Sequence, residues 1–112
     1  MATSTIKNMT TFEELATNIC IYRIGSLRIL DFNDATGSAI SGITLTAADL
    51  PSTDIRGVGL RRTSNAGDTE MGMLVLRYQT GKIDAYKIAS YNGTASLINS
   101  TDTQMGRLMW SV

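Results

Sequence analysis

The chain has 112 residues, with ten Lys and Arg against ten Asp and Glu, so its formal net charge at pH 7 is zero. A neutral chain lacks the long-range field that concentrates nucleic acid or an anionic membrane surface, so neither is an expected partner. The sequence has no histidine and one cysteine, which excludes Ser-His-Asp and Cys-His catalytic arrangements and ordinary structural zinc sites.

The length fits one domain with a single core. No basic segment followed by an apolar run opens the chain, and no stretch approaches the roughly 20 apolar residues that span a bilayer. We therefore expect no membrane insertion and a product that starts out soluble in the cytoplasm of the cell that makes it.

Residues 1–18 are interpreted as an N-terminal lead. Residues 1–10 are rich in β-formers but weakly periodic, as in an entry strand or a flexible lead. Thr11-Phe12-Glu13-Glu14 has the Thr-x-x-Glu spacing of a capping box, which predicts a helical turn through Ala16. The lead is thus expected to be a strand or a short helical turn, ahead of one domain over residues 19–112.

Residues 19–24 and 27–32 alternate between apolar and polar side chains, and Gly25-Ser26 separates them. This pattern predicts a β-hairpin, because glycine at the first of two loop positions suits a type II′ turn. A loop is expected over residues 33–38, and then a strand over residues 39–45 with a bulge at Gly42.

Further strands are expected across the second half of the chain, over residues 55–62, 70–79, 82–89, 95–99 and 105–112. A turn cluster over residues 63–68, Thr80-Gly81 and Asn92-Gly93 separates some of them. Eight or nine antiparallel strands, with at most one short helical turn near the N-terminus, indicate an all-β fold. We expect a two-sheet β-sandwich or jelly roll rather than an open sheet.

Two of these strands, within residues 71–78 and 105–112, are apolar on both faces. A strand of an antiparallel sheet usually has one face in water, so the second apolar face must be covered. Loops of the same chain, or a central place in a thicker core, are one explanation. The other is a subunit interface, whose expected residues are Met71, Met73, Val75, Met105 and Met109.

The sequence contains no candidate catalytic residue. The carboxylates lie mostly in predicted turns, without a spacing that places a pair across a cleft as a glycosidase needs. Residues 31–37 resemble a calcium loop only in acid density, so neither a metal nor another cofactor is expected. Aromatic rings with polar neighbours could bind a sugar, although such rings are more often core. The candidate ligand-binding residues are Tyr78, Tyr86, Tyr91, Asp84, Arg61 and Arg62.

Three passages resemble the C-terminal head domains of tail fibres and receptor-binding proteins from tailed phages. Ile21–Leu30 is similar to the hairpin that opens those heads. The passage from Ile43–Leu45 to Leu50-Pro51, with Ile55–Gly57 after it, is similar to their leucine-proline segment before the central strands. Gly106–Val112 is similar to their last strand, which begins at glycine, carries an aromatic residue and ends the chain.

The resemblance covers residues 19–112 and implies a jelly-roll-like head that forms a homotrimer and binds host cell-surface saccharide without cleaving it. It also implies assembly with other tail or baseplate proteins into a virion, after synthesis in the bacterial host cytoplasm. Because no shaft segment precedes the head, we expect either a fragment of a longer fibre or a small accessory protein. A structural trimerisation or baseplate adaptor module with only protein contacts is the alternative, and a small carboxylate-based enzyme is a third possibility.

Overall fold

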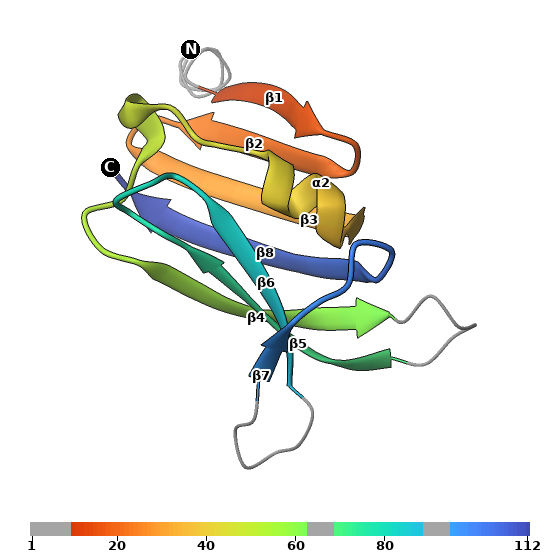
Figure 1. The fold of residues 1–112 in the computed structure, drawn as a ribbon. Helices are drawn as coiled ribbons and strands as arrows, with labels where there is room; N and C mark the ends of the chain where they lie inside the picture. Colours follow the sequence, from red (N-terminus) through yellow and green to blue (C-terminus); the bar gives the residue numbers. More distant parts are fainter. Residues whose placement is uncertain (1–9, 63–68, 89–94) are drawn as a thin grey trace.

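Eight antiparallel strands form one sheet in the computed structural model, which describes residues 10–62, 69–88 and 95–112 (Figure 1). Within these residues the order across the sheet is β1-β2-β3-β8-β4-β5-β6-β7. Two short helical segments, α2 (Gly37–Gly42) and the 3-10 turn η1 (Ala47–Asp49), connect β3 to β4. The strands are β1 (Thr10–Ala16), β2 (Ile19–Ile24), β3 (Leu27–Thr36), β4 (Ile55–Arg62), β5 (Thr69–Leu76), β6 (Ile83–Ile88), β7 (Ala95–Leu97) and β8 (Thr103–Ser111).

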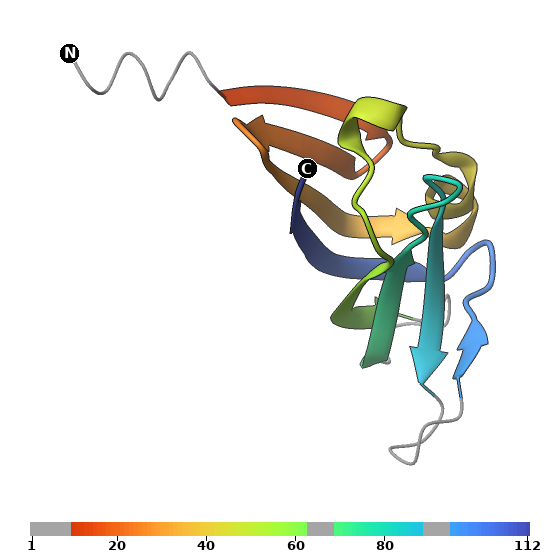
Figure 2. The same cartoon turned by 90° about the vertical axis from the view of Figure 1, so that its left-hand side faces the viewer.

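The prediction of an all-β antiparallel fold with a sandwich-like arrangement is confirmed, but the eight described strands form one bent sheet and not the two sheets expected. Figure 2 shows β5 and β6 running steeply across the direction of β1, β2 and β3. Buried side chains from both parts of the sheet belong to one core cluster, among them Ile21, Leu30, Leu74, Ile83 and Trp110. The inner face of the sheet therefore encloses the core, and the opposite face is the outer face.

The last strand joins the two parts of the sheet. β8 pairs with β3 along most of its length, where Leu30 lies opposite Leu108, and with β4 at its other edge, where Leu60 lies opposite Met105. The predicted β2–β3 hairpin is also confirmed, and Gly25 in its turn has the positive φ, 58°, that favours glycine. The C-terminal residues thus lie at the centre of the sheet.

The helical turn predicted near the N-terminus is wrong, because residues 10–16 form the edge strand β1. β1 pairs with β2, so the sheet begins at Thr10 and not at Ile19. The rings of Phe12 and Tyr22 lie opposite each other with centroids 5.1 Å apart. Cross-strand pairing of this kind prevails over a capping box that has only a few helical residues to stabilise.

The strand predicted over residues 39–45 is also wrong, because its first residues lie in the helix α2. The Thr36 side chain caps the helix by accepting a hydrogen bond from the backbone N–H of Ala39, at 3.2 Å. Ile40 is buried in the core and is 1% exposed. A cap and one buried anchor therefore decide the conformation of a segment whose β-propensity indicates a strand.

Glycines on the inner face allow the sheet to bend at β4 and β8. Gly59 and Gly106 lie opposite each other in the ladder, and we call Gly57, Gly59 and Gly106 the glycine crease. A Cβ on Gly59 would overlap the carbonyl oxygen of Met105, and a Cβ on Gly57 would lie 2.6 Å from Leu108 Cδ2. The crease therefore depends on the absence of side chains.

Gly59→Ala is expected to lower the free energy of unfolding by about 2 kcal/mol, since the added methyl group meets fixed backbone. Gly42→Ala is the matched control, because a Cβ there meets nothing within 4 Å. Its effect should stay within about 1 kcal/mol. Urea unfolding measures both values, and an equal effect of the two substitutions contradicts the proposed role of the crease.

A buried carboxylate attaches the η1 turn to the inner face of β2 and β3. Asp49 is 2% exposed, and its oxygens accept hydrogen bonds from Arg23 Nη2 at 2.8 Å and Arg28 Nε at 2.7 Å. Its backbone carbonyl accepts a hydrogen bond from Trp110 Nε1 at 2.9 Å. The hydrogen bonds from Arg23, followed by those from Arg28, lower the pKa of Asp49 from 3.8 to about 2.

This lowered pKa predicts how stability depends on pH. The carboxylate contributes roughly 2 kcal/mol of stability that is present above its ordinary pKa and is lost as the pH falls through about 2. Asp49→Asn should lower the free energy of unfolding by about 3 kcal/mol at pH 7, because Arg23 and Arg28 each lose a buried carboxylate partner. The difference in the free energy of unfolding between Asp49→Asn and the parent chain should become smaller between pH 4 and pH 2.

Asp34→Asn is the control for Asp49→Asn, because Asp34 forms an exposed ion pair with Arg62 at 3.8 Å. We expect it to change stability by less than about 1 kcal/mol at any pH. Denaturant unfolding over a pH series measures both variants. If the difference in the free energy of unfolding between Asp49→Asn and the parent chain stays constant down to pH 2, the lowered pKa of Asp49 is contradicted.

Candidate functional site

The outer face carries a group of neighbouring apolar side chains, which we call the outer apolar patch. Leu60 on β4 lies between Met71 on β5 and Met105 on β8, as the partner of both in the ladder. Val58 lies two residues before Leu60 and pairs with the half-buried Met73. Val58 is 68% exposed, Met71 56%, Leu60 54% and Met105 38%. Such a group of exposed apolar side chains is typical of an interaction surface.

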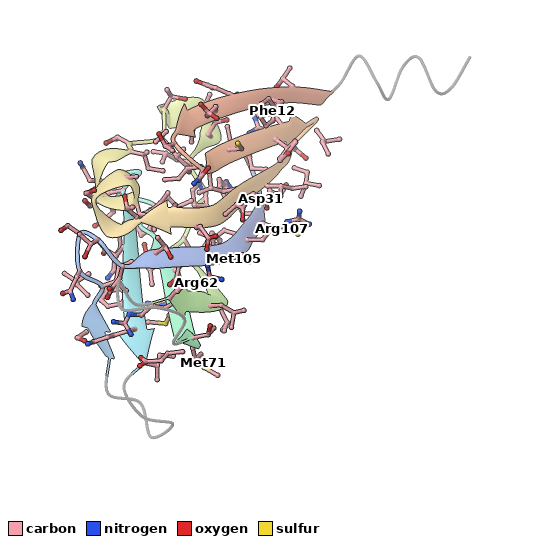
Figure 3. All side chains as sticks on the ribbon, turned by 90° about the vertical axis from the view of Figure 1, so that its right-hand side faces the viewer. Phe12, Asp31, Arg62, Met71, Met105 and Arg107 are labelled. Carbon is pink, nitrogen blue, oxygen red and sulfur yellow. The ribbon has the colours of Figure 1, made fainter. Side chains whose placement is uncertain are left out.

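A second apolar group extends the outer face toward β1. It contains Phe12, which is 57% exposed, and Met109, which is 52% exposed. An ion pair separates it from the outer apolar patch, in which Arg107 Nε lies 2.6 Å from Asp31 Oδ1. Figure 3 shows side chains from β1 to β5 along the same side of the sheet, labelled Phe12, Asp31, Arg107, Met105, Arg62 and Met71.

The charged side chains beside the patch pair within the chain. Arg62 lies 3.8 Å from Asp34. With the Arg107–Asp31 pair, this contact compensates charges beside the patch on the outer face. The patch therefore favours an apolar, uncharged partner surface over a strongly charged one.

Five residues were expected at an oligomer interface, and the structure places four of them on the accessible outer face. Met71, Met105 and Met109 are exposed, and Met73 is half-buried. Val75 is different, since its side chain is 2% exposed and already buried within the chain. The alternation of side chains identified the outer face, but it could not show that neighbouring groups cover Val75.

Three of the predicted sugar-binding residues lie near one another, with Asp84 and Tyr86 on β6 and Tyr78 in the turn before it. Tyr86 OH and Arg77 Nε both contact Asp84 Oδ2, at 3.4 and 3.2 Å. Arg77 also donates to Asp54 at 3.0 Å, and the backbone N–H of Tyr78 donates to the same carboxylate at 3.0 Å. The hydrogen bonds from Tyr78 and then Arg77 lower the pKa of Asp54. These polar groups therefore already have partners within the chain.

The other three candidates do not join that group. Arg61 is 4% exposed and bonds Asp102, with Nη2 2.6 Å from Oδ2, so its assignment as an accessible ligand-binding residue is wrong. Arg62 is exposed on the opposite face of β4. Tyr91 lies outside the described residues. The partner of Arg61 is 41 residues away in the sequence, which the local pattern cannot reveal.

A pocket of about 300 Å³ lies between α2, the start of β6 and the segment after β7. Figure 2 shows α2 beside β6 and beside the segment that joins β7 to β8. Apolar residues and serines both line this space. The lining residues are Gly37, Ser38, Ile40, Ser41, Ile83, Asp84, Ala85, Leu97, Ile98 and Ser100.

Gln104 is a buried polar residue that the sequence analysis missed. It is 0% exposed, and neither its Oε1 nor its Nε2 has a hydrogen-bonding partner within the part of the chain that the structure describes. A Cβ on Gly72 would lie 2.7 Å from Gln104 Cδ, so the amide packs against a bare backbone. An unbonded buried amide of this kind destabilises a fold.

The described ranges hold no group of three or more metal-ligating side chains. They also hold no helix long and apolar enough to cross a membrane. The chain matches no protein-family model, no curated protein and no solved structure. The proposals on function therefore rest on the surfaces and contacts of the chain and on the resemblance in its sequence.

Gln104→Met is expected to raise the free energy of unfolding by about 1 kcal/mol, because it removes the unbonded amide and keeps the length of the side chain. Gln79→Met is the control, since Gln79 is exposed and donates to Tyr78 OH at 3.1 Å. It should change stability by less than about 0.5 kcal/mol. A loss of stability in Gln104→Met, measured by urea unfolding, contradicts the absence of a bonding partner.

Proposed function

We propose that this chain is a non-catalytic head domain of the phage tail-fibre type, which assembles as a homotrimer and binds host cell-surface saccharide within a virion. The outer apolar patch is the observation on which the assembly rests, because Val58, Leu60 and Met71 are each more than half exposed. The number of subunits and the saccharide come from the resemblance in the sequence. Other tail or baseplate proteins would hold the head on the particle.

A second copy of the chain is the partner that the patch fits best. The patch is apolar, and the ion pairs of Arg62 and Arg107 balance the charge around it. Full burial of a Leu or Met side chain contributes about 2 kcal/mol, so each half-exposed one contributes on the order of 1 kcal/mol. A closed trimer repeats every such contact three times, which helps to offset the loss of translational freedom on association.

A structural module with only protein contacts is the second candidate function, and one observation favours it. Asp84 and Tyr86, two of the residues predicted to bind sugar, are bonded to each other, and Asp84 also accepts a hydrogen bond from Arg77 Nε. Their hydrogen-bonding capacity is thus partly used within the chain. The two candidates differ in whether the isolated domain binds any saccharide, which an array of host glycans measures.

Leu60→Lys and Met71→Lys are each expected to convert a trimer of the full chain into a monomer. Each places a charge at the centre of the proposed interface, where it would be buried without a partner. Val112→Lys is the matched control, because Val112 is an exposed apolar residue, 47% accessible, at the chain end and outside the patch. Light scattering coupled to size-exclusion chromatography measures the mass of each variant.

The parent chain and Val112→Lys should both have the mass of three subunits at micromolar concentration. A parent chain that stays monomeric at the highest attainable concentration contradicts assembly through this face. A stable oligomer that Leu60→Lys and Met71→Lys leave intact contradicts the choice of surface, although the chain would still assemble.

A further inference from the structure

The pocket between α2 and β6 has walls that backbone hydrogen bonds hold in place. The N–H of Gly37 donates to the carbonyl of Asp102 at 2.9 Å, and the N–H of Ser38 donates to that of Ser100 at 3.3 Å. On the other wall, the N–H of Ile98 donates to the carbonyl of Ala85 at 3.0 Å. The pocket is therefore formed without a ligand, which lowers the entropy lost when one binds.

Gly37 shows how closely the two walls approach. A Cβ on Gly37 would overlap the carbonyl oxygen of Asn99, so α2 can contact the segment after β7 only because this residue has no side chain. The helix has its own cap at Thr36 and its own core anchor at Ile40. These independent contacts keep α2 in position beside the space.

The chemistry of the lining suits a ligand with an apolar face and polar edges. Leu97, which is 61% exposed, and the half-buried Ile98 form an apolar floor, while the other apolar lining residues, Ile40, Ile83 and Ala85, are at most 5% exposed. Ser38, Ser41 and Ser100 are exposed residues of the lining. The Ser38 hydroxyl lies 3.2 Å from Thr36 Oγ1 and the Ser41 hydroxyl donates to the carbonyl of Ser38 at 3.3 Å, and a hydroxyl oxygen with such a partner can still accept a hydrogen bond. An apolar floor with a few polar groups that fix orientation is typical of small-molecule sites.

The charge and volume of the pocket restrict the ligand further. The lining contains no Lys or Arg, and its one ionisable residue is Asp84. The Asp84 carboxylate already contacts Arg77 Nε and Tyr86 OH, so its charge is compensated. An acidic ligand would find no cation in these walls, and about 300 Å³ lies at the lower end of the range for ligand pockets.

We propose that this pocket binds one uncharged sugar ring, with a C–H face of the ring on Leu97 and Ile98 and its hydroxyls donating to the hydroxyl oxygens of Ser38, Ser41 and Ser100. The proposal rests on the proposed saccharide-binding function and places that function on the α2 side of the molecule. It excludes sialic acids, uronic acids and phosphorylated sugars as the residue that occupies the pocket.

The test is a titration of the full-length ¹⁵N-labelled chain, followed by amide chemical shifts. The uncharged probes are the methyl glycosides of glucose, galactose and N-acetylglucosamine, and the acidic probes are those of glucuronic acid and N-acetylneuraminic acid. At least one uncharged probe should shift the amides of Ser38, Ile98 and Ser100 in a saturable way. The acidic probes should leave these amides unchanged.

Ser41→Trp should weaken that binding at least tenfold, because an indole at an exposed position of the lining fills the mouth of the pocket. Ser100→Trp blocks the pocket from the segment after β7, so the test does not depend on one variant folding. Ser52→Trp is the matched control, an exposed serine outside the lining, and should bind like the parent chain.

Three results overturn the assignment. One is that no uncharged probe shifts the pocket amides, and another is that the acidic probes bind equally well. The third is unchanged binding in both blocked variants. Saturable shifts at Tyr78 and Tyr86 alone would overturn the pocket but leave saccharide binding in place. If no probe shifts any amide while the chain still forms trimers, both the pocket assignment and the saccharide-binding function are overturned. The structural module with only protein contacts is then the remaining candidate function.

Discussion

The close approach of backbones at the glycine crease is the constraint on which the rest of the structure depends. Gly59 and Gly106 pair without side chains on the inner face, and a Cβ on Gly106 would already lie 3.0 Å from Leu74 Cδ1. Because Leu74 on β5 reaches over β4 to β8, one sheet can enclose its own core. The same bend places the outer apolar patch on one side of the molecule and α2 on the other.

The sequence predicted the elements whose signals are local. The strands β2 and β4 have the predicted bounds and β3 begins where predicted, because alternation and the Gly25 turn need no distant partner. The loop predicted over residues 33–38 is wrong, because β3 continues to Thr36, where it pairs with Thr103 of β8. It did not predict α2, because the burial of Ile40 in the core and the hydrogen bond from Gly37 to Asp102, 65 residues later, depend on the folded chain. It also did not place β8 between β3 and β4, because that pairing joins residues from both ends of the chain.

The residues of the candidate sites were likewise predictable from the sequence only where the signal is local. Alternation in β5 and β8 was enough to identify Met71 and Met105 on an outer face, whereas their neighbour Leu60 becomes evident only from the register of β4. The pocket was beyond sequence reasoning, because residues 37–41, 83–85 and 97–100 meet only in the folded chain. Arg61 and Arg62 are adjacent in sequence but lie on opposite faces, so one is buried and the other exposed.

The separation of the two surfaces gives the proposed function a physical rationale. A trimer that forms through Leu60 and Met71 on the outer face leaves the α2 side of each subunit open to solvent. A shallow site for one uncharged sugar ring binds weakly by itself, since it offers hydroxyls and an apolar floor but no ion pair. Three such sites on one rigid assembly make the second and third contacts intramolecular, which raises the overall affinity without any new contact. In the proposed assembly the apolar outer face would thus determine how strongly a host surface is held, although it would not touch the sugar.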